Sequence, residues 1–392
     1  MAMKNTLAPL LVTLAIQVMT ALSMMAVPVL ASNAAPDIGV SAAYVGLFVA
    51  LIYLGAMISS VAGGALVPRF GAIRVSQICL LLCAVGLALA MLGLPAIMTV
   101  AALIIGCGYG PITPASSHVL AKSTPPHLTG LVFSLKQTGV PLGGLLAGLL
   151  VPPLVLLAGW RAALACVSVV CLVVAAFAQA MRPSIDCDRE PGRRIDLTAV
   201  LAPLKQVLGV PSIRALALAS LFYSAMQLCL MGYMVTYLVQ DLELSLVRAG
   251  ILLAIAQAGG VFGRIAWGTV ADRWIPPQRM FGLLGLTMAG GAAATALFSP
   301  AWPDSALMLT LMLFGAAAIG WNGVMLAQVA RLASPGKVGL ATGGTLFFTF
   351  FGVVTGPLLF GAIVGSGLGY RAAYLLLALP AFAVGLRFTF GR

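Results

Sequence analysis

The amino-acid sequence contains a long internal repeat. Residues of the first half recur about 204 to 210 positions later in the second half. A repeat of about half the chain indicates two copies of one structural unit in a single polypeptide. The recurring residues are Gly46, Gly55, Gly64, Arg69 and Gly130, which correspond to Gly250, Gly259, Gly268, Arg273 and Gly339, and the run Gly159-Trp160-Arg161-Ala162-Ala163, which corresponds to Gly369-Tyr370-Arg371-Ala372-Ala373.

The composition places both copies in a membrane. The chain is 61% hydrophobic and only 8% charged, and its mean hydropathy is +1.11. A soluble domain carries roughly 25% charged residues, so this chain could not cover itself with a water-compatible surface. The apolar runs are continuous rather than alternating, and a bilayer core offers no water to the backbone. We therefore expect membrane-spanning helices and not a β-barrel.

The 392 residues divide into about twelve spans of ~20–25 residues. We expect an all-α integral membrane protein with six-helix bundles at residues 1–181 and 213–392. A polar linker at 182–212 joins them and includes a short interfacial helix near 196–208. The expected spans are 7–31, 43–67, 75–94, 96–118, 129–157, 161–181, 213–238, 246–270, 279–298, 305–330, 339–364 and 370–388.

The basic residues predict the orientation. Of the 21 Lys and Arg, Arg161, Arg248 and Arg371 fall on one face, Lys136 and Arg264 fall inside spans, and the other sixteen fall on the opposite face. Cytoplasmic loops carry the excess of positive charge, so both termini are expected in the cytoplasm. The net charge of +12 is then a topology signal and a contact layer for anionic lipids, and it does not require a nucleic-acid partner.

The loops after the second and eighth spans carry a family resemblance. The first reads Gly64-Ala65-Leu66-Val67-Pro68-Arg69-Phe70-Gly71, and the second reads Gly268-Thr269-Val270-Ala271-Asp272-Arg273. Both resemble the Gly-x-x-x-Asp-Arg-x-Gly signature of the major facilitator superfamily, and the repeat extends the resemblance over the whole chain. The resemblance implies a secondary transporter with two parallel six-helix bundles that rock about a central substrate site.

These loops supply the candidate gating residues. A carboxylate at a helix end can accept helix N-terminal amides and pair with arginines, so Asp272 is expected to act as a latch. Arg264 lies two turns earlier on about the same face, and Pro68 takes the acidic position in the first copy, so the two halves need not gate alike. An ordinary solvated topology charge is the alternative interpretation. The gating set is Gly64, Arg69, Gly71, Arg264, Gly268, Asp272 and Arg273.

Inside the spans, charge is scarce. All nine Asp and Glu fall outside the expected spans, so no carboxylate within the membrane is expected to carry protons or to bind a cation. Lys136 lies seven or eight residues inside the fifth span, where a cation is costly unless it faces a cavity or a partner. We interpret it as a contact for an anionic substrate. The alternatives are a side chain that reaches the cytoplasmic surface and a pair with a backbone carbonyl.

Polar residues near mid-depth complete the candidate substrate site. The fourth and tenth spans are interrupted by Gly and Pro at corresponding places in the two halves, which points to the substrate site. Amide and hydroxyl side chains there could bind substrate, although each alone is also compatible with an interhelical hydrogen bond. The candidate substrate-binding residues are Lys136, Gln17, Tyr109, Tyr223, Gln227, Gln257, Trp321 and Asn322.

The sequence lacks the parts of an enzyme. It has no Ser–His–acid set, no metal-ligand cluster and no nucleotide-binding loop, so no cofactor, metal or catalytic residue is expected. His118 and His127 are expected at the surface or the membrane interface, and the alternative for His118 is a proton relay. We expect a monomeric transporter in a bacterial inner membrane that moves a small organic anion or polar metabolite, with its coupling ion open. The alternatives are an exporter of a neutral or amphipathic compound and a non-transporting sensor or scaffold.

Overall fold

The computed structural model of the chain describes residues 2–40, 45–193 and 197–391, and all their secondary structure is helical. Nine helical segments among these residues are long and apolar enough to cross a membrane. Two of the nine, 126–188 and 338–390, are long enough to hold two expected spans each. Together with α12 (Pro277–Ala296, 20 residues), they account for the twelve expected helices. Residues 43, 44 and 196, where two expected helices begin, lie outside the described residues.

The described chain forms two compact units. Unit 1 contains Met1–Pro125, Lys136–Arg214 and Leu332–Phe347, and unit 2 contains Pro126–Leu135, Ala215–Arg331 and Phe348–Arg392. Each unit therefore includes a short segment from the other half of the sequence. The expected division into residues 1–181, a linker at 182–212 and residues 213–392 stays a prediction.

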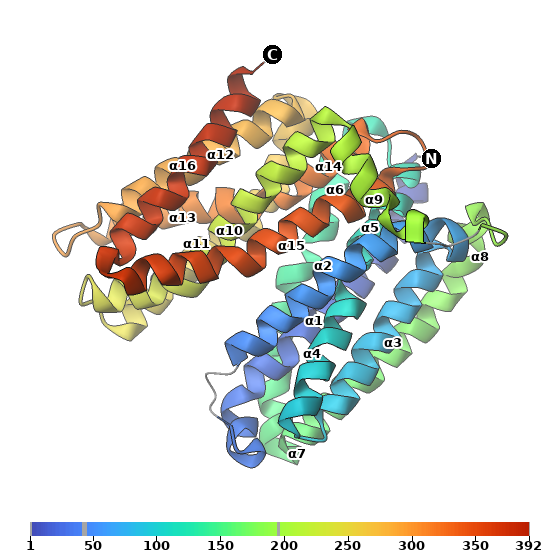
Figure 1. The fold of residues 1–392 in the computed structure, drawn as a ribbon, viewed down its shortest axis with the longest axis horizontal. Coiled ribbons are helices and arrows are strands. Elements are labelled where there is room, and N and C mark those ends of the chain that lie inside the picture. The colour runs from blue at the N-terminus through green and yellow to red at the C-terminus, as the bar shows by residue number, and fades with distance from the viewer. Residues whose placement is uncertain (1, 41–44, 194–196, 392) are drawn as a thin grey trace. The chain divides into compact units, whose positions relative to one another are not determined.

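Unit 1 is built around a long helix pair, in which α1 packs along α7, while α3 contacts both α4 and α7, and α2 contacts α4 (Figure 1). The short helices after α7 form the linker, and α9 matches the helix expected near 196–208. The helices are α1 (Ala2–Ile38), α2 (Val45–Phe70), α3 (Ala72–Ala90), α4 (Pro95–Tyr109), α5 (Ile112–Ser123), α7 (Gly139–Ala178), η3 (Gln179–Met181), α8 (Arg182–Ile185), η4 (Asp186–Asp188) and α9 (Leu197–Gly209).

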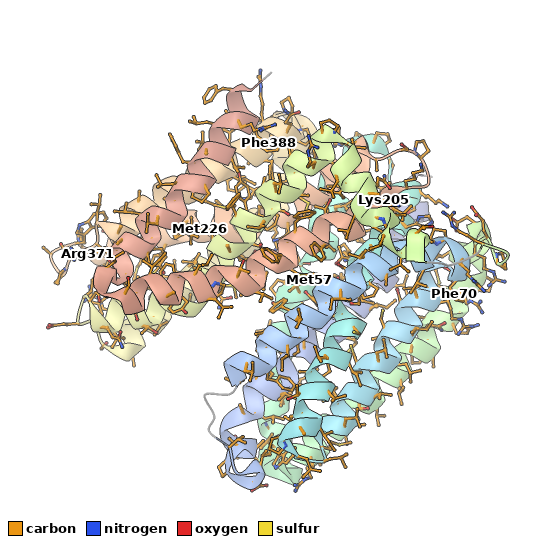
Figure 2. All side chains as sticks on the ribbon, in the orientation of Figure 1. Met57, Phe70, Lys205, Met226, Arg371 and Phe388 are labelled. Carbon is orange, nitrogen blue, oxygen red and sulfur yellow. The ribbon has the colours of Figure 1, made fainter. Side chains whose placement is uncertain are left out.

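In unit 2, α12 packs against α16 and α13, and α11 packs against α13. Arg371 and Phe388 lie near opposite ends of α16 (Figure 2). Four helices, α6, α10, α14 and α15, have residues in both units. The remaining helices are η2 (Pro126–Leu128), α6 (Thr129–Gln137), α10 (Pro211–Gln240), α11 (Leu246–Arg273), α13 (Asp304–Gly320), α14 (Asn322–Leu332), α15 (Val338–Ile363), η5 (Val364–Leu368) and α16 (Gly369–Phe390).

The repeated glycine marks the turn between the last two spans of each half. Gly159 has φ 81° and ψ 165°, and Gly369 has φ 77° and ψ 175°. This backbone conformation is open to glycine and strained for other residues, because only glycine lacks a Cβ. The chain therefore reverses direction at the same residue in both halves, which explains why the sequence repeat is clear at this point.

The arginine two positions after this glycine makes an equivalent hydrogen bond in each half. Arg161 Nε donates to the Met91 carbonyl at 3.0 Å, beside the end of α3. Arg371 Nη2 donates to the Phe298 carbonyl at 3.2 Å, just beyond the end of α12. In each half the repeated arginine therefore satisfies a carbonyl that a helix end leaves open.

The aromatic residue beside each arginine fastens the first helix of its half. Trp160 Nε1 donates to Asp37 Oδ2 at 2.8 Å, near the end of α1. The Tyr370 hydroxyl donates to Gln240 Oε1 at 3.0 Å, at the end of α10. The repeat thus encodes the same corner twice, with an indole donor in one copy and a phenol donor in the other.

Large apolar side chains also cover the outside of the described structure. Leu156 is 85% exposed and Phe262 is 81% exposed. A water-soluble protein rarely leaves contiguous apolar surface of this kind open, whereas lipid tails solvate it. The exposed side chains are therefore those of a membrane protein.

Candidate functional site

The cation predicted from the sequence lies in a buried polar cluster of unit 1. Lys136 is 1% exposed, and its Nζ donates to Gln17 Oε1 at 2.6 Å, to Thr113 Oγ1 at 3.2 Å and to Gln137 Oε1 at 3.2 Å. Thr113 also donates to Gln17 Oε1 at 3.3 Å. The side chain therefore does not reach toward the cytoplasmic surface, which was one alternative interpretation.

Breaks in two helices bring this cluster together. Lys136 and Gln137 form the last turn of α6, and α7 begins at Gly139. Thr113 follows the break between α4 and α5, where Gly110 and Pro111 interrupt the fourth span. Proline removes a backbone donor and disfavours a continuous helix. The interruption noted in the sequence therefore positions a hydroxyl that the sequence analysis did not select.

A second polar cluster lies in unit 2. Gln227 Oε1 accepts from Trp321 Nε1 at 3.1 Å and from Asn322 Nδ2 at 3.3 Å. Trp321 is fully buried, whereas Gln227 and Asn322 are half-buried. Here too a helix break sets the geometry, because α13 ends at Gly320 and α14 begins at Asn322.

The tryptophan determines which way both amides point. An indole nitrogen can only donate, so the oxygen of Gln227 must face Trp321 and its Nε2 must point elsewhere. Asn322 then donates its own nitrogen to the same oxygen, and its Oδ1 is left as an acceptor. Gln227 Nε2, a donor, and Asn322 Oδ1, an acceptor, thus take no part in these two hydrogen bonds.

Three other predicted residues stand outside these hydrogen-bonded clusters. Tyr223 is fully buried, donates to the Phe281 carbonyl at 3.1 Å and packs edge-on against Trp321 with 5.7 Å between ring centroids. Tyr223 and Trp321 therefore have no exposed surface. Their rings pack together, and Trp321 holds the Gln227 amide by a hydrogen bond. Tyr109 in unit 1 is 9% exposed, and Gln257 on α11 is exposed.

Asp272 lies in the last turn of α11, in unit 2. Its two oxygens accept the backbone N–H groups of Gly130 at 2.9 Å and Leu131 at 2.8 Å, at the start of α6. Arg331, in the last turn of α14, pairs with the same carboxylate at 2.7 Å. Sequence reasoning named Arg264 and Arg273 as latch residues and missed Arg331, which had been counted only as a topology charge.

The other gating residues lie around these loops. Arg264 is 3% exposed, Arg273 is exposed at the end of α11, and Arg69 lies 5.4 Å from the centroid of the Phe70 ring.

The repeated glycines make close helix contacts. A Cβ on Gly268 would lie 2.6 Å from the Gly130 carbonyl oxygen, and one on Gly64 would lie 2.9 Å from that of Gly339. Equivalent glycines thus pack against equivalent helix starts.

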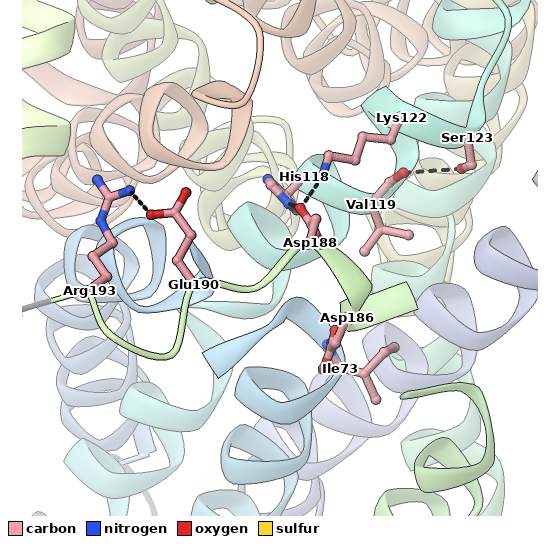
Figure 3. A network of polar contacts seen from close by, with 9 residues as sticks. All are labelled: Ile73, His118, Val119, Lys122, Ser123, Asp186, Asp188, Glu190 and Arg193. Carbon is pink, nitrogen blue, oxygen red and sulfur yellow. Dashed lines mark hydrogen bonds and ion pairs between the residues drawn. The ribbon is translucent and has the colours of Figure 1, made fainter. Parts of the chain in front are cut away.

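His118 does not lie on the open surface but pairs with an acid of the linker. His118 is 8% exposed, and its Nε2 lies 2.7 Å from Asp188 Oδ2 in the linker, which also binds Lys122 (Figure 3). Partial burial alone would raise the pKa of Asp188, but the hydrogen bonds from Lys122 and His118 and their positive charges outweigh it and hold that pKa below its ordinary value. The sequence placed the linker acids outside the expected spans but indicated no partners for them.

Comparisons with known proteins agree with this architecture. The family model of the Major Facilitator Superfamily matches residues 12–343. The gallate transporter of Pseudomonas putida is 27% identical over 391 residues, covering 89% of this chain and 84% of that protein. The benzoate transport protein of Acinetobacter baylyi is 23% identical over 304 residues and 70% of this chain, and the match spans 64% of that protein, less than two thirds of its length.

Solved structures show the same fold. The fucose:proton symporter FucP of E. coli matches with a TM-score of 0.77 at 17% identity, and the match covers 98% of each chain. Because the family model matches well over half of the sequence, this multi-pass membrane protein belongs to the Major Facilitator Superfamily.

Proposed function

We propose that this protein transports a small organic anion across a bacterial inner membrane by alternating access, and that an aromatic carboxylate is the substrate class. The observation that carries the proposal is the buried ammonium group of Lys136, held by Gln17, Thr113 and Gln137. The names of two relatives, a gallate transporter and a benzoate transport protein, support the same chemistry.

The physical argument concerns charge. Three of the oxygens that accept from Lys136 belong to neutral side chains. They satisfy N–H groups but bring no formal negative charge. Opposite charges attract far more strongly in a low-dielectric interior than in water. A substrate carboxylate that reaches this cluster would therefore meet a fixed cation whose hydrogen-bond geometry is already set, and a neutral compound of the same shape would gain much less.

The pair in unit 2 suits a hydroxyl group. Gln227 Nε2 is a donor and Asn322 Oδ1 is an acceptor, as their bonds to Trp321 and to each other require. A hydroxyl group donates one hydrogen bond and accepts others, so it complements such a pair. We propose that these two amides select hydroxylated substrates over their unsubstituted analogues.

The carboxylate of Asp272 supports the proposed gate. It is 3% exposed, and it ties the starts and ends of separate helices through two amides and one arginine. A transporter that alternates between states needs contacts that are stable in one state and broken in another. We propose that Asp272 and Arg331 form such a contact.

A thermal-shift experiment tests the charge proposal. The purified protein and the variants Lys136→Gln and Lys122→Gln are heated with benzoate, benzyl alcohol or benzylamine, which share a ring and differ in charge. We expect benzoate alone to raise the melting temperature. That shift should vanish in Lys136→Gln and persist in Lys122→Gln, which loses the same charge from a side chain that is 48% exposed.

Two results would contradict this proposal. Equal stabilisation by benzyl alcohol in the wild type and in Lys136→Gln would make Lys136 a structural residue and favour the export of neutral compounds. No flux of any tested anion in reconstituted vesicles, despite binding, would favour a non-transporting sensor.

A further inference from the structure

The first residues of the linker bind back onto unit 1 through a buried carboxylate. Asp186 lies in η4, and its side chain is 1% exposed. Its Oδ1 accepts the Ile73 N–H at 2.9 Å and its Oδ2 accepts the Arg74 N–H at 3.1 Å (Figure 3). These amides belong to the first turn of α3, whose N–H groups have no partner within the helix. Asp186 therefore caps the start of α3, although it lies more than a hundred residues later in the sequence.

This arrangement has the same form as the one around Asp272. Each carboxylate accepts two consecutive backbone N–H groups at a helix start. Each also has an arginine nearby: Arg182 Nε is 3.7 Å from Asp186, and Arg331 Nη2 is 2.7 Å from Asp272. Asp272 lies in the last turn of α11, whereas the equivalent turn of α2 carries Pro68 at the acidic position.

Two more contacts fix the same stretch of linker. The backbone N–H of Glu190 donates to the Pro68 carbonyl at 2.7 Å. Asp188 binds His118 and Lys122 on α5. The linker therefore contacts both the α2–α3 loop and the end of α5. One of its hydrogen bonds is to the carbonyl of Pro68, the residue at the acidic position.

The loop itself is shaped to receive Asp186. Gly71, which joins α2 to α3, has φ 90°, a conformation that residues with a Cβ rarely adopt. A Cβ at this position would overlap the Asp186 carboxylate. The glycine thus provides both the sharp turn and the space in which the carboxylate sits.

We infer that residues 182–190 form a clamp, the linker clamp, that holds the α2–α3 loop of the first repeat, and that Asp186 is its positioning residue. The clamp supplies a carboxylate to the helix start beside a loop that has no acid of its own. The expected effect of the clamp on turnover rests on the proposed transport function, but the existence of the clamp does not.

Cys187 offers a reporter inside the clamp, because it is exposed and lies between the two aspartates. Cys107 and Cys166, the other accessible cysteines of the described chain, are replaced by Ser, and a nitroxide spin label is attached to Cys187. We expect an immobilised spectrum for the parent protein and a mobile spectrum for Asp186→Asn, because an amide nitrogen would face backbone N–H groups and could not accept from them.

Glu190→Gln is the matched control. The Glu190 side chain is 64% exposed and pairs only with Arg193 among the described residues, so its loss of charge should leave the label immobile. If Asp186→Asn does not accumulate as folded protein, Asp188→Asn provides a milder release, because that side chain is 31% exposed. A label that stays immobile in the folded aspartate variants, or that Glu190→Gln releases equally, would overturn the clamp.

A transport assay distinguishes a positioning role of Asp186 from a purely structural role. We expect Asp186→Asn to lower the turnover of reconstituted, folded protein about fivefold, with an unchanged half-saturating concentration of substrate. Unchanged turnover with a mobile label would overturn the positioning role. If the wild type itself moves no anion, the proposed function fails, and the label measurement still decides the clamp.

Discussion

Asp272 and Arg331 form an ion pair in which the carboxylate is 3% exposed and the arginine side chain is 32% exposed, with 2.7 Å between Oδ1 and Nη2. The same carboxylate accepts the Gly130 and Leu131 amides. Exposed ion pairs contribute little, but hydrogen bonds to a buried charged group contribute about 1.5–3 kcal/mol each. The partly buried geometry therefore gives this contact enough free energy to act as the proposed switch between two states of a transporter.

Asp272→Asn should slow conformational cycling more than it weakens substrate binding. The amide keeps the shape of the carboxylate but loses its charge and one acceptor oxygen, so the bonds to α6 and α14 weaken. We expect turnover to fall about tenfold, which corresponds to about 1.4 kcal/mol in the barrier, with little change in half-saturation. Initial uptake rates in proteoliposomes measure both quantities.

The exposed neighbour Arg273 provides the control for this prediction. Arg273→Gln also removes one charge at the end of α11, of the opposite sign, without removing either partner of the ion pair, and it should leave turnover near the wild-type value. Normal turnover in Asp272→Asn would show that the ion pair is not part of the cycle.

The helices could be predicted from the sequence because one physical requirement dominates them. A span in a bilayer must be apolar and must satisfy its own backbone, so hydropathy locates it without knowledge of its neighbours. The repeat added the corner at Gly159 and Gly369, because a positive φ restricts the residue type in both copies.

The contacts between side chains could not be predicted in the same way. Arg331 follows Asp272 by 59 positions and looked like one of many cytoplasmic charges. Asp186 lies 113 positions after Ile73, in a polar linker where acids are unremarkable. Lys136 was identifiable because a charge inside an apolar span is rare, but its partners depend on how three helices pack, and no local pattern encodes that.

Gln227→Leu should remove the preference for hydroxylated aromatic acids. Leucine keeps the approximate size of the side chain but provides no donor. A neutral hydrogen bond contributes about 0.5–1.5 kcal/mol net, so we expect the affinity ratio of 4-hydroxybenzoate to benzoate to fall about threefold to tenfold. Competition binding with both compounds measures this ratio directly.

Trp321→Phe tests the cause of that preference. It keeps a buried ring and removes the Nε1–H that orients Gln227, so the ratio should fall in the same direction. An equal loss of affinity for both compounds would indicate a general packing defect, and an unchanged ratio in Gln227→Leu would exclude the amide pair from hydroxyl recognition.

The linker contact at Asp188 should weaken in acid. Its folded-state pKa is lowered from the ordinary value of 3.8, so the unfolded chain binds the proton more readily than the folded protein. The contact therefore stabilises the fold at neutral pH, and its contribution is lost as the pH falls through the lowered pKa, below about 4. Asp188→Asn lacks the titrating group, so the melting temperatures of wild type and variant should converge between pH 6 and pH 3. A gap that stays constant or widens in acid would contradict the assignment.

Two glycines of α7 should respond in opposite directions to the same substitution. No atom lies within 4 Å of a Cβ built on Gly159 or on Gly148, so alanine meets no steric obstacle at either position. Gly159 has φ 81° and ψ 165°, where a non-glycine residue costs of order 1–3 kcal/mol. Gly148 is helical, and alanine there should stabilise by about 0.5–1 kcal/mol.

Melting temperatures should therefore fall in Gly159→Ala and stay level or rise in Gly148→Ala. A harmless Gly159→Ala would mean that the turn between the last two spans tolerates an ordinary backbone, and the repeat of this glycine at Gly369 would then need another cause.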